Sequence, residues 1–258
     1  RKWDFTAWST ATQTNLEAEA SEHVSEPWPA AGTETGWRRY EKDGGVTDAD
    51  GLKAPNTIYW YGSKITSPTE LKANGVTIEE TKGLLFNNVT KLNNTIAVAI
   101  DYPETSIGTY AGGSYLWLNG SDLQFTISGV LPGQKILMEV ESHKSSEGRG
   151  VKLSVDGVEI GSCEPKAKTT YEWTVPLNLG TKLVDVLVSS TAGCHIYLIE
   201  VGDADHIGTG IEGIETDGGV LKSNVYTTGG VLVRKAGQPL GKLAKGVYIM
   251  DSKKVVVK

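Results

Sequence analysis

The stretch Val151-Lys-Leu-Ser-Val-Asp-Gly-Val-Glu-Ile160 decides the fold class. Apolar and polar residues alternate on both sides of its centre, which is the period-two pattern of strands with one buried face. The Asp-Gly pair at the centre suits a two-residue turn between antiparallel strands, because both residues tolerate positive φ angles. We therefore predict a β-hairpin, with Leu153 and Val155 before the turn and Val158 and Ile160 after it.

The same alternation recurs along most of the chain after Asn56, in segments separated by Gly, Pro, Asn and Asp clusters. Composition agrees, since 64 of the 258 residues are Thr, Val or Ile, which pack well on a pleated sheet. We predict an all-β fold with negligible helix over residues 56–202, a two-sheet antiparallel β-sandwich of jelly-roll topology. The clearest inward-facing side chains are Ile96, Val98 and Ile100; Leu123, Phe125 and Ile127; Ile136, Met138 and Val140; and Val184, Val186 and Val188.

Charge is divided unevenly along the chain. Residues 218–258 carry seven Lys, one Arg and one Asp, a net charge of +7, which leaves −13 on the rest of the chain. An acidic body argues against a nucleic-acid partner, because neutralising phosphates requires a basic face. No apolar run approaches the roughly 18 residues of a membrane-spanning helix, so we expect no transmembrane segment.

The pattern predicts three parts. Residues 1–204 form the sandwich, with long loops and one helical turn near Leu16 in their first quarter. Residues 205–217 are acidic and rich in Gly, show no regular spacing of apolar residues, and are typical of a linker. Residues 218–258 form a small C-terminal β domain, because both the charge and the periodicity change there.

The C-terminal unit resembles a known family through three stretches: Gly230-Val-Leu-Val-Arg-Lys, Gly237-Gln-Pro-Leu, and the closing Lys245-Gly-Val-Tyr-Ile-Met-Asp-Ser-Lys-Lys-Val-Val-Val-Lys. They are similar to the C-terminal sorting domains of type IX secretion, found on secreted proteins of Gram-negative anaerobes. The resemblance extends over most of 218–258. It implies a protein that is secreted or attached to the cell surface of a Gram-negative bacterium, with outer-membrane secretion machinery as a partner.

Residues 1–204 resemble the galactose-binding-like jelly rolls that serve as carbohydrate-binding modules, in the versions found with β-helical pectate-lyase-like proteins. The resemblance rests on the order of several short motifs. They are Lys2-Trp-Asp-Phe with Trp8, Gly36-Trp-Arg-Arg-Tyr, Lys82-Gly-Leu-Leu-Phe, and the block from Tyr115 to the 150–157 hairpin. The β-helix is missing, because a sandwich and a tail leave no room for it in 258 residues. Lyase or esterase chemistry therefore does not carry over.

No catalytic motif stands out. Glu139 and Glu141 are two apart on a strand, so they share a face at about 7 Å, but a solvated sheet face is the simpler explanation. The four histidines, His23, His143, His195 and His206, lack the spacing of a zinc site or a triad. The Gly208-Thr-Gly-Ile-Glu-Gly run lies in the acidic segment, without the flanking strand and helix that a dinucleotide site requires. We expect a protein that is not an enzyme.

We expect no cofactor except, as one alternative, a structural Ca²⁺. The candidate ligands are Asp43, Asp48 and Asp50, in a Gly-bent loop whose hard oxygen atoms suit that ion. The spacing is not that of an EF-hand, and a plain acidic turn is the other interpretation. Cys163 and Cys194 could be bridged or free, and their spacing does not decide between the two.

Aromatic residues supply the candidate ligand site. A sugar-binding surface pairs flat rings with planar hydrogen-bonding groups, because sugars have apolar C–H faces and a rim of hydroxyl groups. Alternation places Tyr59 and Tyr61 on one face and Trp60 with Ile58 on the other, and turns Tyr115 and Trp117 outward if Leu116 and Leu118 are core. Ordinary packing under long loops is the alternative for each. The candidate ligand-binding residues are Trp37, Arg38, Tyr59, Tyr61, Tyr115 and Trp117.

The leading hypothesis is a non-catalytic carbohydrate-binding protein, secreted or on the cell surface, whose partner is a polysaccharide or other glycan. A cell-surface adhesion or structural module that binds another protein is the alternative, and a polysaccharide-active enzyme is the third. The first two differ in whether exposed aromatic rings converge on one patch or lie scattered.

Overall fold

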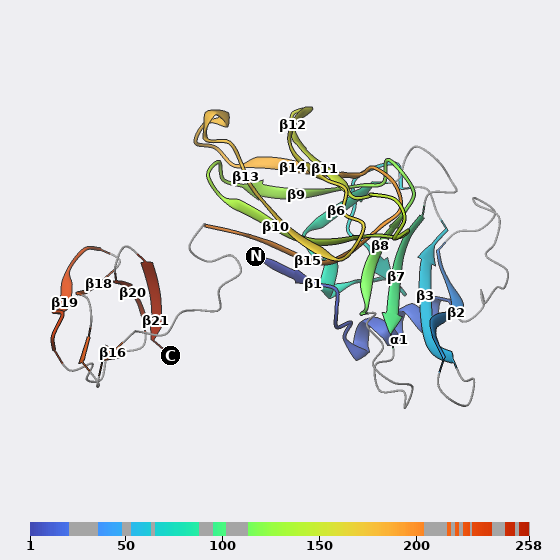
Figure 1. Cartoon of the computed structure of the whole chain (residues 1–258), viewed down its shortest axis with the longest axis horizontal. Coiled ribbons are helices and arrows are strands. Elements are labelled where there is room, and N and C mark those ends of the chain that lie inside the picture. The colour runs from blue at the N-terminus through green and yellow to red at the C-terminus, as the bar shows by residue number, and fades with distance from the viewer. Residues whose placement is uncertain are drawn as a thin grey trace. The chain divides into compact units, whose positions relative to one another are not determined.

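The computed structural model describes residues 1–20, 36–47, 53–62, 65–87, 95–101 and 113–203, followed by the shorter stretches 216–217, 220–221, 224–227, 229–238, 246–250 and 253–257. The chain divides into two compact units, Arg1–Val201 and Gly202–Lys258 (Figure 1). Among the helices of these described residues, none is long and apolar enough to cross a membrane.

Two antiparallel sheets form the first unit. Within the described residues, the larger sheet has eight strands in the order β13-β10-β15-β8-β7-β3-β2, with β1 also paired to β15. Its strands are β1 (Lys2–Asp4), β2 (Trp37–Thr47), β3 (Lys53–Tyr61), β7 (Thr95–Asp101), β8 (Tyr115–Asn119), β10 (Lys135–Ser142), β13 (Thr169–Thr174) and β15 (Cys194–Gly202). The smaller sheet has the order β12-β11-β14-β9-β6. Its strands are β6 (Leu84–Asn87), β9 (Gln124–Val130), β11 (Val151–Val155), β12 (Val158–Cys163) and β14 (Val184–Ser190).

The chain passes repeatedly from one sheet to the other, since β9, β11, β12 and β14 belong to the smaller sheet and β10, β13 and β15 to the larger. Such crossing between two sheets is how a jelly roll is built. The predicted all-β, two-sheet antiparallel sandwich is confirmed.

The predicted hairpin is present. β11 and β12 pair from Val155 opposite Val158, and the two turn residues have positive φ angles, 49° at Asp156 and 79° at Gly157. Positive φ at both central residues is typical of a type I′ turn, whose twist matches that of the strands it joins.

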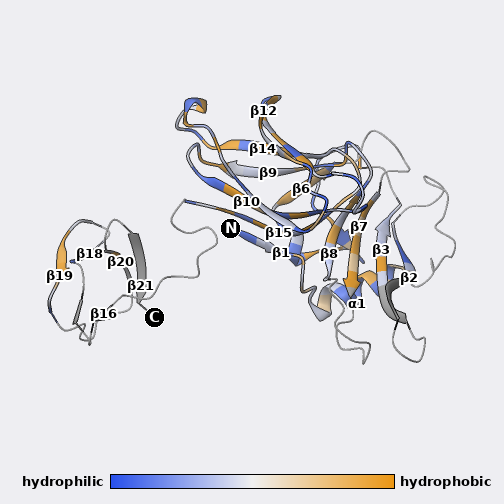
Figure 2. Cartoon of the chain, viewed as in Figure 1, coloured by the Kyte–Doolittle hydropathy of each residue, from blue (hydrophilic) through white to orange (hydrophobic). Residues whose placement is uncertain are grey.

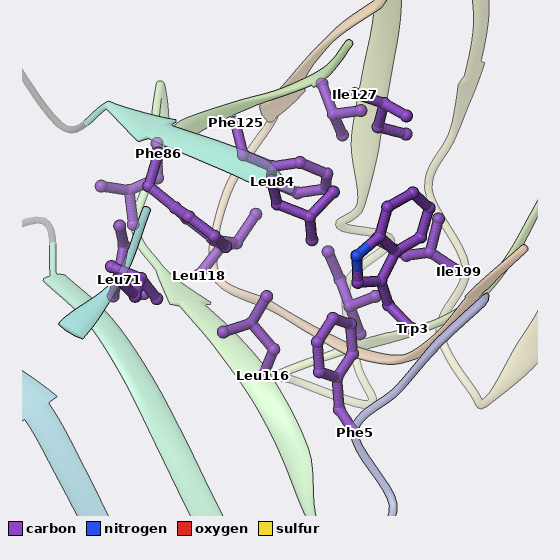
Figure 3. Close-up of a cluster of buried hydrophobic side chains, with 14 of the residues drawn as sticks. Trp3, Phe5, Leu71, Leu84, Phe86, Leu116, Leu118, Phe125, Ile127 and Ile199 are labelled. Atoms are coloured by element: carbon purple, nitrogen blue, oxygen red, sulfur yellow. The ribbon is translucent and has the colours of Figure 1, made fainter. Parts of the chain in front are cut away.

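The core lies between the sheets. Burial alternates strictly along β10, where Ile136, Met138 and Val140 are inaccessible and their neighbours are partly exposed. Figure 3 shows how Trp3 and Phe5 from the N-terminal segment meet Leu116 and Phe125 from the two sheets. The predicted inward residues are buried, except Val184, which is partly buried against the same cluster.

One helix is longer than the sequence predicted. α1 (Thr10–Ala20) has 11 residues, where the sequence predicted one turn. Its buried side chains are Thr12, Leu16 and Ala20, spaced four apart, so the apolar stripe is one residue wide and contains a threonine. The helix depends on contacts with the rest of the chain more than on its own pattern.

The remaining elements of the first unit are short. They are β4 (Lys72–Ala73) and β5 (Val76–Thr77), which pair with each other, and the 3₁₀ turns η1 (Glu79–Thr81) and η2 (Leu177–Leu179). The described part of residues 56–202 contains no helix longer than these turns, as predicted.

Within its described residues, the second unit contains a four-stranded antiparallel sheet in the order β19-β18-β20-β21. Its strands are β18 (Val225–Thr227), β19 (Leu232–Arg234), β20 (Gly246–Met250) and β21 (Lys253–Val257). A separate pair joins β16 (Thr216–Asp217) to β17 (Val220–Leu221), so the last two residues of the predicted linker are in a strand.

Candidate ligand-binding site

The six predicted ligand residues do not form one surface. Trp37 pairs with Tyr61 across β2 and β3, and these two side chains, with Tyr59, belong to the core cluster between the sheets or pack against it. On the outer face of the larger sheet, Tyr115 and Trp117 lie in or against a second apolar cluster. The alternation correctly separated Tyr59 and Tyr61 from Ile58 and Trp60 and turned Trp117 away from the core between the sheets, but Tyr59 and Tyr61 face that core and not solvent.

Most of these residues are less exposed than a sugar platform requires. Trp37 is inaccessible, and Tyr59, Arg38 and Trp117 are 4%, 4% and 6% exposed. Expecting these four outside the core was wrong, because both faces of the larger sheet are covered near β3 and β7. Figure 2 shows β7 as hydrophobic over most of its length, and Ile96 to Ile100 are all buried. Tyr61 and Tyr115 remain partly exposed.

An open pocket lies between α1 and strands β2 and β3, close to two of the predicted segments. Its volume is about 600 Å³, within the range of small-molecule sites. The lining residues are Thr10, Gln13, Thr14, Glu17, Ala18, Arg39 and Tyr59. Tyr59 was predicted as a ligand residue, and Arg39 adjoins the predicted Arg38. The helix residues were missed, because only a single helical turn was expected there.

Glu17 joins the helix wall of the pocket to the strand wall. Its carboxylate accepts a hydrogen bond of 2.6 Å from the Tyr59 hydroxyl, and its other oxygen lies 3.5 Å from Nη1 of Arg39. Both ends of the ion pair are partly open to water, since the side chains of Arg39 and Glu17 are 28% and 47% exposed. The pocket therefore offers a planar donor beside a planar acceptor, with hydroxyl and amide groups from the helix around them.

The helix that carries one wall is fixed at both ends. At its start, Glu80 accepts hydrogen bonds of 2.6 Å from the Ser9 backbone N–H and from the Thr12 hydroxyl. At its end, Glu19 accepts hydrogen bonds from the backbone N–H groups of Trp37 (3.0 Å) and Asn74 (2.6 Å). These contacts hold α1 at a set distance from β2, so the pocket is a feature of the folded chain.

A second group of polar and aromatic side chains lies on the outer face of the larger sheet, over β8, β10 and β15. His195 stacks on Tyr115 with ring centroids 3.9 Å apart, and His143 stacks on Trp117 at 4.5 Å. Nδ1 of His143 lies 3.1 Å from Nε2 of His195. The sequence did not suggest this pair, because the two histidines are 52 residues apart and only the sheet brings them together.

Glu141 completes this group. Its Oε2 lies 3.5 Å from Nδ1 of His195 and accepts a hydrogen bond of 2.5 Å from the Tyr197 hydroxyl. His195 has the largest effect on the pKa of Glu141 and lowers it; partial burial opposes this, and Tyr197 adds to the lowering. Glu139, which shares the strand, pairs instead with Lys168 at 3.4 Å.

The calcium candidates cannot be placed as a site. Asp43 lies on β2 opposite Pro55, and its side chain is outside the described residues, as are Asp48 and Asp50 entirely. Among the described residues, no three His, Cys, Asp or Glu side chains converge as a complete metal site. Cys163 and Cys194 are both free and buried.

Comparison with known proteins gives a partial likeness only. No family model and no curated protein matches the chain. Among solved structures, a family 35 carbohydrate-binding module from Paenibacillus barcinonensis is similar, with 15% identity and a TM-score of 0.30, covering 48% of this chain and 94% of that one. A native family 35 module from Clostridium thermocellum has 14% identity and a TM-score of 0.27, covering 39% and 86% of the two chains.

Proposed function

We propose that the chain binds carbohydrate without acting on it, and that the pocket between α1 and β2–β3 is the site. The observation that supports the proposal is the Glu17–Arg39 pair beside Tyr59, at the wall of an open pocket of about 600 Å³. A sugar ring presents adjacent hydroxyl groups that both donate and accept. A carboxylate beside a guanidinium can accept from one hydroxyl and donate to the next.

The chemistry of the lining also favours binding over hydrolysis. Glycoside hydrolysis by the usual route needs two carboxyl groups at a controlled separation. Of the described residues that line the pocket, Glu17 alone carries a carboxyl group. A glycan held there would find hydrogen-bonding partners but no acid–base pair.

The decisive experiment combines a glycan array with variants that block the pocket. Thr14 and Ala11 are both exposed residues of α1, but only Thr14 lines the pocket. Thr14→Trp should fill the mouth of the pocket and weaken binding to the best array ligand by about tenfold or more. Ala11→Trp is the matched control and should bind as the unmodified chain does, with both variants keeping the same melting temperature.

Two substitutions within the pocket test the polar contacts. Glu17→Gln keeps the shape of the side chain but removes its charge, and should weaken binding by about tenfold, the usual value of a charge-assisted hydrogen bond. Tyr59→Phe removes only the hydroxyl that orients Glu17, and should weaken binding less. Equal affinity in all of these variants would place the glycan elsewhere, and an array without a hit would favour the protein-binding alternative.

We also propose that the protein is exported to the cell surface or secreted into the medium, with residues 218–258 as its sorting signal. The support is the resemblance of this C-terminal stretch to type IX sorting domains. Expression in a host with that secretion system, with and without residues 218–258, tests this. The shorter chain should stay inside the cell envelope while the full chain reaches the surface or the medium.

A further inference from the structure

The two stacked histidines on the outer face of the larger sheet form a site of their own, on residues that do not line the α1 pocket. His143 follows the end of β10, and His195 is the second residue of β15. Their facing nitrogen atoms, Nδ1 of His143 and Nε2 of His195, are 3.1 Å apart. That separation suits a hydrogen bond, and it also suits two ligands of one metal ion.

The distance can be compared with metal geometry directly. Imidazole nitrogen atoms bind zinc and similar ions at about 2.0–2.1 Å, so two of them in neighbouring positions lie about 2.9 Å apart at a right angle and about 3.3 Å apart at a tetrahedral angle. The observed separation of 3.1 Å falls between these values. An ion could therefore replace the shared proton without a change in the distance between the two nitrogen atoms, with each ring turning so that its lone pair points at the ion.

The surroundings of His195 resemble those of a metal ligand. A ligating histidine generally presents its other ring N–H to a carboxylate, a backbone carbonyl or water, which fixes the tautomer and directs the lone pair of the first nitrogen toward the ion. Here Glu141 Oε2 lies 3.5 Å from Nδ1 of His195, and the Tyr197 hydroxyl holds that carboxylate in place. A proton on Nδ1 leaves Nε2 as the lone pair that faces His143.

Both rings are held before any ion arrives. His195 is 9% exposed and lies on Tyr115, and His143 lies on Trp117, which is itself 6% exposed. Rings that are already fixed lose little conformational entropy when they bind, which favours affinity from a small number of ligands.

We propose that His143 Nδ1 and His195 Nε2 bind one divalent transition-metal ion, with Glu141 and Tyr197 supporting His195 from behind. Two imidazoles favour Cu²⁺ most, followed by Ni²⁺ and Zn²⁺, and offer little to Ca²⁺ or Mg²⁺, which prefer oxygen ligands. Among the described residues no third His, Cys, Asp or Glu joins the pair, so water or a solute supplies further ligands. On binding, His143 carries its proton on Nε2 and His195 keeps its proton on Nδ1.

The test uses the full chain without a polyhistidine tag, in a His23→Gln/His206→Gln background that removes the other two histidines. Calorimetric titration with Zn²⁺ should give one equivalent, and the electron paramagnetic resonance spectrum with Cu²⁺ should show coupling to two imidazole nitrogens. Zn²⁺ should also raise the melting temperature, because an ion that binds only the folded state stabilises it, whereas Ca²⁺ should not.

Variants of the site decide the assignment. His143→Gln, at a partly exposed position, should weaken Zn²⁺ binding by at least about tenfold and remove its effect on the melting temperature. Glu141→Gln should weaken it by about 10-fold to 100-fold, the usual effect of losing a supporting carboxylate. Glu139→Gln is the matched control, since Glu139 has the same strand and face but pairs with Lys168, and it should leave affinity unchanged.

Two results would overturn the proposal. Absence of a Zn²⁺ or Cu²⁺ complex in the His23→Gln/His206→Gln background would show that the contact is a hydrogen bond between imidazoles and nothing more. Binding that survives His143→Gln, in a protein whose circular dichroism spectrum is unchanged, would place the ion elsewhere.

Discussion

Trp117 shows how a side chain can face away from the main core and still be buried. It lies on the outer face of β8, where it packs with Ile58, Trp60 and Ala97 and stacks on His143. Period-two alternation predicts which face of the sheet a residue occupies, but not whether that face is covered. The sequence therefore predicted correctly that Trp117 points away from the main core, and wrongly that its side chain is exposed to solvent.

Replacing Trp117 with Ala should destabilise the fold. Truncating a buried Trp leaves a cavity, and the usual loss is about 3–5 kcal/mol in the free energy of unfolding. Urea unfolding followed by circular dichroism measures the change, with Trp117→Phe expected to lose less. A Trp117→Ala midpoint equal to that of the unmodified chain would show that this side chain contributes little packing.

The two cysteines should resist thiol reagents while the chain is folded. Burial raises the pKa of Cys163 to about 11 and raises that of Cys194 as well, so the reactive thiolate is scarce near neutral pH. We expect slow labelling by a disulfide reagent at pH 8, and reaction of both thiols once urea unfolds the chain. Rapid labelling of either thiol in the folded protein would contradict the burial seen here.

At the scale of elements, most strands after residue 56 could be predicted, but β2, which lies where loops were expected, and all but one turn of α1 could not. Alternation along β9, β10 and β14 identifies each strand from its own residues, because one face is buried and the other is not. α1 has a single large apolar residue, Leu16, in its buried stripe. Its position depends on the hydrogen bonds to Glu80, which comes from a distant part of the chain, and no local pattern reveals that contact.

Glu80 should make the stability of α1 depend on pH. Burial acts to raise its pKa, but the hydrogen bonds from Thr12 and Ser9 outweigh this and hold the pKa below its usual value. A group whose pKa is lower in the folded state stabilises the fold above its unfolded pKa, and this contribution is lost as pH falls through the folded pKa.

Glu80→Gln should therefore cost about 1 kcal/mol near neutral pH, and the cost should shrink below about pH 4.3. Urea midpoints of the two proteins between pH 7 and pH 3 measure this difference. Glu79→Gln is a suitable control, since the Glu79 side chain pairs with exposed Lys82 on the surface. A difference between Glu80→Gln and the unmodified chain that stays constant over this range would rule out the ionised carboxylate as the cause.

At the scale of the molecule, the candidate site depends on contacts between distant segments. The sequence indicated Tyr59 and the segment around Arg39 through their residue types, and both adjoin the pocket. It could not indicate Glu17, because this residue reaches the pocket only through the packing of α1 on β2. Nor could it pair His143 with His195, since that requires knowing that the chain segments that carry them are adjacent in one sheet.

The first unit should fold without the second. Every residue of its main core cluster lies between Trp3 and Val201, and the strand pair that closes it joins β1 to β15, with Arg1 and Val201 hydrogen-bonded to each other. A chain ending at Asp203 should therefore melt at the temperature of the corresponding transition in the full chain and bind glycans equally. Limited proteolysis of the full chain should cut first between Asp203 and Asp217, since strand contacts hold the chain on the N-terminal side of this segment. Aggregation of the shortened chain would show that the first unit needs the second, and first cleavage within 96–201 would contradict the boundary between the units.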